Sequence, residues 1–189
     1  AKQTRHPFEE AEHKTTEVLE IVHMDICGPM PEASLGGHNY IATLLDNYSS
    51  LSAVVPLKKK SDTIKAIQDM FAAFETQTGK KIKATRTDNG GEYIKTELED
   101  YFKSKGINHQ TTVPYTPEQN GKAERLNRTL MEKTRAMLID AGLPDDLWGE
   151  AVTTANFVRN RSPVAKKDKT PWELFYGNKP DVSILRTFG

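Results

Sequence analysis

The sequence has little cysteine, no long apolar run and no excess of either charge. Its single cysteine, Cys27, excludes an internal disulfide, and with the histidines it forms none of the usual zinc spacings. No stretch approaches the ~20 apolar residues of a membrane span, and residues 1–17 lack the apolar centre of a signal peptide. Basic and acidic residues number 26 each, so any basic surface must come from local clustering. We expect no zinc, no membrane partner and no export signal.

The apolar pattern predicts one domain of mixed α and β structure. The expected strands are 18–28, 40–46, 51–57, 81–87 and 107–113. The expected helices are 61–79, 96–106, a long helix ending near 142, 144–160 and 171–177. Ser61 or Asp62 caps the first helix and Gly79 ends it. The long helix begins either at Pro117 or near Lys122, and the second start is favoured because Gly121 interrupts the earlier segment.

The order of these elements is βββαβαβαα, which predicts a mixed five-stranded sheet flanked by helices. The first three strands follow one another closely, so we expect them to form an antiparallel meander. This arrangement leaves the first and fourth strands free to be neighbours. The predicted fold class is therefore α/β.

Three acidic residues stand at the ends or in the middle of these elements. Asp25 lies inside the first strand, where a lone carboxylate needs a basic partner, a proton, a backbone amide or a metal. Asp88 ends the fourth strand in the turn-forming stretch TDNGGEY. Glu124 stands one residue off the apolar stripe of the long helix. If the first and fourth strands are neighbours, all three carboxylates converge at one edge of the sheet.

Carboxylates that crowd together repel one another, so such a cluster is stable chiefly when divalent cations occupy it. Oxygen ligands without histidine or cysteine favour Mg²⁺ or Mn²⁺ over zinc. Two ions about 3.5–4 Å apart can clamp the attacking and leaving oxygens of an in-line phosphoryl displacement. The three acids therefore indicate phosphoryl transfer.

The phrases around these acids resemble a known family. Asp88 and Glu124 are separated by 35 residues, with Asp25 upstream. The acids lie in VHMDICGPM, TRTDNGGEY and VPYTPEQNGKAERLNRTL, and LWGEAV and NRSP follow. Over residues 15–189 the sequence is similar to the integrase core of Ty1/copia-type retrotransposon Pol polyproteins, with the D,D(35)E set of the retroviral integrase superfamily. The resemblance implies an RNase H-like fold.

The resemblance also implies roles for individual residues. Asp25 bridges two Mg²⁺ or Mn²⁺ ions, and Asp88 and Glu124 each complete the site of one, so that all three are catalytic and metal-binding. The implied DNA contacts are Asn120, Lys122, Arg125 and Arg128. Asn120 matches a mobile active-site loop, and Arg128 lies one turn beyond Glu124, where a solvated arginine is the alternative. The lysines of LKKKSD, residues 57–62, indicate a nucleic-acid patch or an ordinary solvated turn.

The implied organisation and function follow from the same resemblance. Residues 1–17 are expected to be a linker that follows a zinc module absent from this sequence, residues 18–162 the integrase catalytic core, and residues 163–189 a C-terminal extension. The expected function is a Mg²⁺-dependent integrase that processes the 3′ ends of element DNA and joins them to target DNA. The alternatives are an RNase H-type nuclease and a domesticated or decayed module that binds DNA or protein without catalysis. The expected partners are DNA and further copies of the chain, in the nucleus or in a cytoplasmic virus-like particle.

Overall fold

The computed structural model describes residues 15–88, 92–111, 121–165 and 167–189, apart from the side chains of 92–95. The strands are β1 (Ile21–Cys27), β2 (Tyr40–Asp46), β3 (Ser52–Leu57), β4 (Ala84–Thr87) and β5 (Asn108–Thr111). The helices are α1 (Thr63–Thr78), α2 (Glu92–Lys105), α3 (Gly121–Ala141), α4 (Trp148–Arg161) and α5 (Pro171–Tyr176). The expected order of strands and helices is confirmed, with α5 following α4.

The five strands form one mixed sheet in the order β3-β2-β1-β4-β5. The first three strands pair antiparallel, as the meander requires, and β1, β4 and β5 run parallel to one another. The first and fourth strands are neighbours, which is the condition under which the acids were expected to converge. The sheet therefore carries β1 at its centre, where residues from β2 and β4 both reach it.

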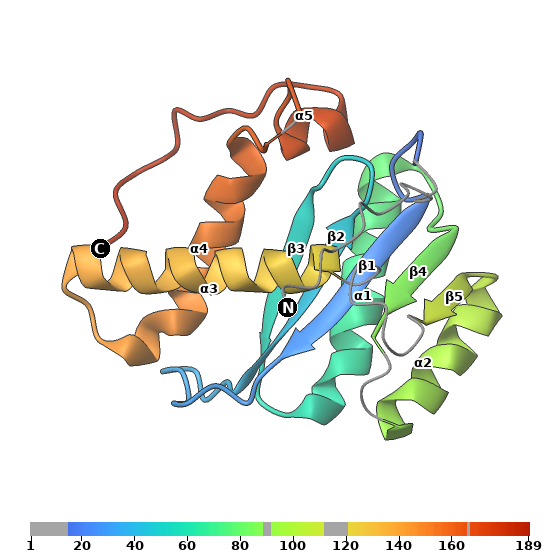
Figure 1. The fold of residues 1–189 in the computed structure, drawn as a ribbon, viewed down its shortest axis with the longest axis horizontal. Helices are drawn as coiled ribbons and strands as arrows, with labels where there is room; N and C mark the ends of the chain where they lie inside the picture. Colours follow the sequence, from blue (N-terminus) through green and yellow to red (C-terminus); the bar gives the residue numbers. More distant parts are fainter. Residues whose placement is uncertain (1–14, 89–91, 112–120, 166) are drawn as a thin grey trace, which may run out of the picture.

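Helices cover both faces of the sheet (Figure 1). Phe71 of α1 and Leu44 of β2 lie in one apolar cluster, to which α2 also contributes. Leu130 of α3, Val152 of α4 and Ile41 of β2 lie in the other. Figure 1 shows the N-terminal end of α3 at the sheet and the rest of α3 extending past the sheet, where α4 crosses and contacts it. The first turn of α3 is thus fixed over β1 and β2.

The chain after α4 is part of the same packing. Phe175 of α5 is buried in the cluster of α1, with its ring 5.0 Å from that of Phe74. Gly177 ends α5 in the left-handed conformation, at φ 77°. The proposed boundaries at residues 17 and 162 stay predictions. Within the described ranges, no helix is long and apolar enough to cross a membrane.

Some expected element ends are wrong, for local physical reasons. The first strand begins at Ile21 and not at residue 18, because Leu19 has a left-handed backbone with φ 65°, which cannot continue a strand. Asp62 is the N-cap residue of α1, as one of the two expectations had it, but its side chain makes no capping hydrogen bond to α1. Asp62 instead accepts a hydrogen bond from the backbone N–H of Lys59 at 3.0 Å and so closes the short helical turn before α1. Gly79 ends α1 as expected, at φ 67°.

Candidate active site

The pairing of β1 with β4 places two of the predicted acids level with each other. His23 of β1 is paired with Arg86 of β4 in the parallel ladder. Asp25 and Asp88 each lie two residues beyond this pair, on neighbouring strands that are about 4.8 Å apart. Asp25 and Asp88 also line the same cleft, which has a volume of about 100 Å³. The two carboxylates therefore share one edge of the sheet.

The Asp25 carboxylate accepts two hydrogen bonds and, within the described residues, has no cationic partner. Its Oδ1 accepts from the backbone N–H of Ile26 at 2.9 Å. Its Oδ2 accepts from the side-chain Nδ2 of Asn127 at 2.8 Å. Among the described residues, no lysine or arginine forms an ion pair with Asp25. Of the options left open by the sequence, a basic partner is therefore excluded within the described part of the chain.

The surroundings of Asp25 favour its protonated form. Burial raises the pKa of Asp25 first, and the charges of Asp88 and then Glu124 raise it further, to about 6 from an ordinary value of 3.8. The hydrogen bonds from Ile26 and Asn127 act in the opposite direction. Both other acids are thus near enough for their charges to be felt at Asp25, although one comes from β4 and the other from α3.

Glu124 reaches this edge from the first turn of α3. Its side chain is exposed, whereas Ala123 and Leu126 beside it are buried. A carboxylate in the first helical turn is favoured by the N-terminal end of the helix dipole. In this position the charge of Glu124 acts on Asp25 while the Glu124 carboxylate itself stays exposed to solvent.

Asn127 is a site residue that the sequence analysis missed. It is buried on the inner face of α3, one turn after Glu124. Its Nδ2 donates to Asp25, and its Oδ1 accepts from the hydroxyl of Thr43 on β2 at 2.9 Å. A polar residue inside the apolar stripe of Leu126 and Leu130 was the signal that could have identified it. Asn127 locks α3 to both central strands and fixes the orientation of the Asp25 carboxylate.

Asn127→Ala is expected to lower the free energy of unfolding by about 1–3 kcal/mol at pH 7, because it leaves a partly buried carboxylate oxygen without its donor. The pKa of Asp25 should rise further for the same reason. Urea unfolding measures the first effect and titration of Asp25 by NMR the second. Asn108→Ala, at an exposed position of β5, is the matched control. Equal stability losses in the two variants would contradict this role of Asn127.

The predicted DNA contacts are distributed around the start of α3. Arg125 and Arg128 are exposed, and Lys122 is partly buried with its Nζ donating to Asn47 Oδ1 at 2.7 Å. Asn120 lies outside the described residues. Of the lysines in residues 57–62, Lys60 lines the cleft that Asp25 and Asp88 share. The assignment of all these residues to DNA stays a prediction.

The cleft is also lined by polar groups that the sequence analysis did not consider. His109 of β5 and Thr87 of β4 line it, and their side chains are hydrogen-bonded at 2.8 Å between Thr87 Oγ1 and His109 Nε2. Because Thr87 immediately precedes Asp88, this bond ties the end of β4 to β5. The position of Asp88 therefore depends on both strands that flank β4, which are β1 and β5.

The chemistry of the donor set fits a hard divalent cation. Asp25, Asp88 and Glu124 offer only carboxylate oxygens, which Mg²⁺ and Mn²⁺ prefer. In the described part of the chain, no group of three His, Cys, Asp or Glu side chains is close enough to hold one ion. The charges of Asp88 and Glu124 thus act on Asp25, although the described side chains do not form a closed set of ligands. The role of the three acids as metal ligands stays a prediction.

Comparison with known sequences points to one family. The family model described as "Integrase core domain" matches residues 15–117. The retrovirus-related Pol polyprotein from transposon TNT 1-94 of Nicotiana tabacum is 43% identical over 189 residues, which are 100% of this chain and 14% of that protein. The corresponding polyprotein from transposon RE1 of Arabidopsis thaliana is 30% identical over 189 residues, 100% of this chain and 13% of that protein. The chain thus spans a small part of the curated relatives that it matches.

Comparison with solved structures supports the fold. A chain of the simian T-cell lymphotropic virus intasome, in complex with the PP2A regulatory subunit B56 gamma, has a TM-score of 0.74 and 21% identity, covering 96% of this chain and 62% of that chain. The HTLV-2 integrase catalytic core domain in complex with magnesium, in its trimeric form, has a TM-score of 0.64 and 21% identity, covering 84% of this chain and 97% of that chain. The RNase H-like fold of retroviral integrase cores is therefore confirmed for this chain.

Proposed function

This chain belongs to the integrase core domain family, and from that premise we propose that it is the catalytic core of a copia-type retrotransposon integrase. It is a metal-dependent polynucleotidyl transferase that processes the 3′ ends of element DNA and joins them to target DNA. The observation that carries the proposal is the convergence of three acids from β1, β4 and α3, two of which line one cleft. That the relatives are retrovirus-related Pol polyproteins supports the same assignment.

Each of the two steps replaces one phosphorus–oxygen bond with another. In end processing, the oxygen of a water molecule forms a bond to phosphorus as the bond to the leaving 3′ oxygen breaks, and the proton that the water loses is balanced by protonation of that 3′ oxygen. In strand transfer, the 3′ hydroxyl of the element is the nucleophile, and its proton is balanced by protonation of the 3′ oxygen released from the target strand. Because each step forms one phosphorus–oxygen bond and breaks another, catalysis consists mainly of positioning the reactants and of stabilising the charge that develops on the phosphate.

Asp25, Asp88 and Glu124 are the residues that would hold the divalent ions. Bound Mg²⁺ supplies activation of the nucleophilic oxygen and neutralisation of the charge that develops on the phosphate. The chain itself provides orientation, because Asn127 and the N–H of Ile26 fix both oxygens of Asp25. A similar fold was solved in complex with magnesium, which supports the proposed choice of ion.

The proposed partners are DNA and further copies of the chain. Structures with a similar fold include one from an intasome and integrase cores in dimeric and trimeric forms. We place the reaction in the nucleus or in a cytoplasmic virus-like particle, where element DNA is present. The exposed Arg125 and Arg128, beside Glu124 on α3, would contact DNA phosphates.

The test is incubation of the chain with element-end and target oligonucleotides in Mg²⁺ or Mn²⁺. The expected result is a joined product in which the element 3′ end is linked to the target strand, with none in EDTA. An RNase H-type nuclease would cleave and release products without joining them, and a decayed binding module would do neither. Either result would contradict the proposed function. The fold is checked beforehand by circular dichroism, so that an unfolded sample is not scored.

A further inference from the structure

Three cationic side chains from distant parts of the chain contact the turn between β2 and β3. They form the basic cluster of Lys122, Arg159 and Lys167. The Nζ of the first donates to Asn47 Oδ1 at 2.7 Å, and the Nζ of the lysine after α4 donates to the carbonyl oxygen of Tyr48. The Nη1 of the arginine donates to the carbonyl oxygen of Ser50 at 2.9 Å and to the hydroxyl of Ser52 at 3.0 Å. Four residues of one hairpin thus accept hydrogen bonds from three cationic side chains.

The charge of this cluster is balanced only in part. Asp46 is the acid at the turn, and its buried oxygens accept hydrogen bonds from the N–H of Leu19 and from the N–H and hydroxyl of Ser49. Arg159 and Lys167 form no ion pair with any carboxylate among the described residues. Among the described residues, Asp46 is the acid that faces Arg159 and Lys167, which leaves an excess of positive charge at the turn.

The charges of Lys122 and Arg159 affect the pKa of Lys167. Burial lowers the pKa of Lys167, the charge of Asp46 opposes this, and the charges of the other two cations lower the pKa further. Burial lowers the pKa of Arg159 to about 10. Crowded, partly buried cations of this kind are stabilised by an anion with several acceptor oxygens, which relieves their repulsion and supplies hydrogen-bond acceptors.

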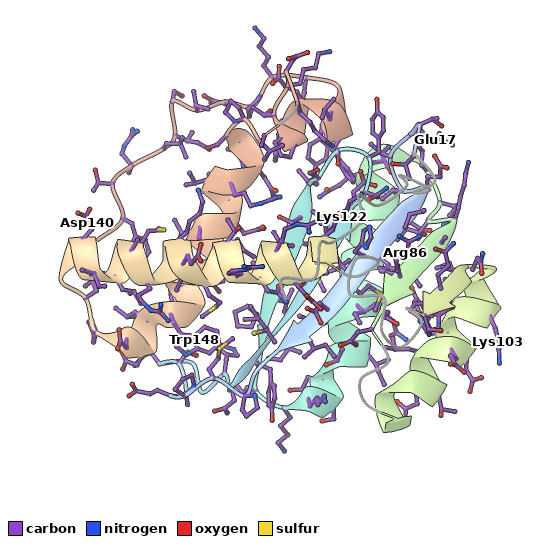
Figure 2. All side chains as sticks on the ribbon, viewed as in Figure 1. Glu17, Arg86, Lys103, Lys122, Asp140 and Trp148 are labelled. Atoms are coloured by element: carbon purple, nitrogen blue, oxygen red, sulfur yellow. The ribbon has the colours of Figure 1, made fainter. Side chains whose placement is uncertain are left out.

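The cluster lies close to the proposed catalytic edge. Lys122 is two residues before Glu124 on α3, and Figure 2 shows it at the helix end that meets the sheet. In the β1–β2 ladder, Asp25 is paired with Thr43 and Val22 with Asp46, so the turn begins three residues away from Asp25. That separation is about 10 Å along the strand, which is the axial rise of about three nucleotides in one DNA strand.

We propose that the basic cluster is a phosphate-binding surface over which the DNA backbone runs as it leaves the catalytic edge. This inference rests on the proposed function, because it names nucleic acid as the anion. Lys122 and Lys167 would each contact a phosphate oxygen, and Arg159 would hold the turn in place beneath them. The turn is therefore part of the DNA-binding surface, although its sequence NYSS has no basic residue.

A purely structural role for the cluster makes a different prediction. Three hydrogen bonds from α3, α4 and the segment after α4 fasten the turn to the rest of the fold. If fastening were the whole role, removing the charge of Lys167 would lower stability and leave DNA binding unchanged. If Lys122 and Lys167 contact DNA phosphates, the salt dependence of DNA binding should instead become weaker with each positive charge that is removed.

The experiment measures binding of a blunt duplex DNA oligonucleotide by fluorescence anisotropy in EDTA, over a range of NaCl concentrations. The variants are Lys122→Gln, Lys167→Gln and the double variant, with Lys167→Arg to keep the charge. Lys103→Gln is the matched control, because this exposed lysine of α2 lies far from Lys122 in Figure 2. The slope of log affinity against log salt is expected to shrink by about 0.9 for each cation lost. The Lys167→Arg and Lys103→Gln variants are expected to keep the wild-type slope.

An unchanged slope in folded Lys122→Gln and Lys167→Gln proteins would overturn the inference, and so would a lower melting temperature without a change in slope. Absence of salt-dependent DNA binding by the wild type would overturn it as well. Because the assay contains no divalent ion, it is independent of catalysis. A reduced slope in a protein that never joins DNA would support the phosphate surface while the proposed strand-transfer function fails.

Discussion

Asp25→Asn is expected to abolish strand transfer and, at neutral pH, to raise the free energy of unfolding of the metal-free protein. The catalytic loss should be complete within detection, because an amide cannot supply the anionic oxygens with which Asp25 would hold the divalent ions. The gain in stability has a separate cause. Burial and the charges of Asp88 and Glu124 make the ionised Asp25 unfavourable in the folded chain.

The sign of the stability change follows from the raised pKa. Asp25 has a pKa of about 6 in the folded protein against an ordinary 3.8, so between these values the folded state binds more protons than the unfolded state. The free energy of unfolding therefore falls as pH rises through this window. A shift of about two units corresponds to roughly 3 kcal/mol at neutral pH. Losing one hydrogen bond at the new amide costs about 1 kcal/mol, which leaves a net gain of about 1–2 kcal/mol.

Urea unfolding of the wild type and of Asp25→Asn from pH 4 to pH 8 isolates the contribution of Asp25 to the free energy of unfolding. The contributions of the other titrating groups cancel in the difference between the two proteins. The difference should be small near pH 4 and grow to its full size by pH 7. Asp100→Asn on α2 is the control, since Asp100 is exposed and does not line the cleft. Intact strand transfer by Asp25→Asn would remove Asp25 from the metal site. A loss of stability at pH 7 would show that its hydrogen bonds outweigh its charge.

The positions of Asp25 and Asp88 could be predicted from sequence because they depend on local signals and on strand order. An acid inside an apolar strand is conspicuous, and a turn-forming stretch fixes the end of the next parallel strand. Once β1 and β4 are neighbours, the register places both carboxylates at one edge. The orientation of the long helix could be predicted in the same way. Its apolar period shows which face of the helix packs against the sheet, and Glu124 lies beside that face.

Contacts between distant segments could not be predicted in this way. Asn127 occupies a buried position of α3, but its partners on β1 and β2 depend on how the helix crosses the sheet. Arg159 and Lys167 are remote from the β2–β3 turn in sequence, and only the packing of α4 brings them to it. The left-handed backbone of Leu19 has no signal in its residue type, because leucine rarely adopts it.

Glu124→Gln is expected to abolish strand transfer while leaving the metal-free fold almost unchanged. The side chain is exposed, so the amide loses only the favourable interaction of a carboxylate with the first turn of α3. That interaction is worth about 0.3–1 kcal/mol at most. The variant thus differs from Asp25→Asn, which should become more stable for the same loss of activity.

Divalent ions provide a second measurement on the same variant. An ion that binds only the folded state stabilises it by RT ln(1 + [L]/Kd), about 2.7 kcal/mol at a hundredfold excess over Kd. The gain should be smaller in the free protein, because DNA phosphates supply some of the oxygen ligands that Mg²⁺ needs. Mn²⁺ should raise the melting temperature at least as much as Mg²⁺, and Ca²⁺ should bind without supporting transfer.

Removing one anionic ligand should reduce the metal-induced rise in melting temperature of Glu124→Gln relative to the wild type. Glu132→Gln is the matched control, since Glu132 is an exposed glutamate two turns further along α3. Its thermal shift and its strand transfer should both equal those of the wild type. If Glu124→Gln also keeps both, Glu124 is an ordinary solvated residue of α3, and its charge reaches Asp25 without taking part in catalysis. A lost thermal shift with intact transfer would instead place a metal at Glu124 that the reaction does not use.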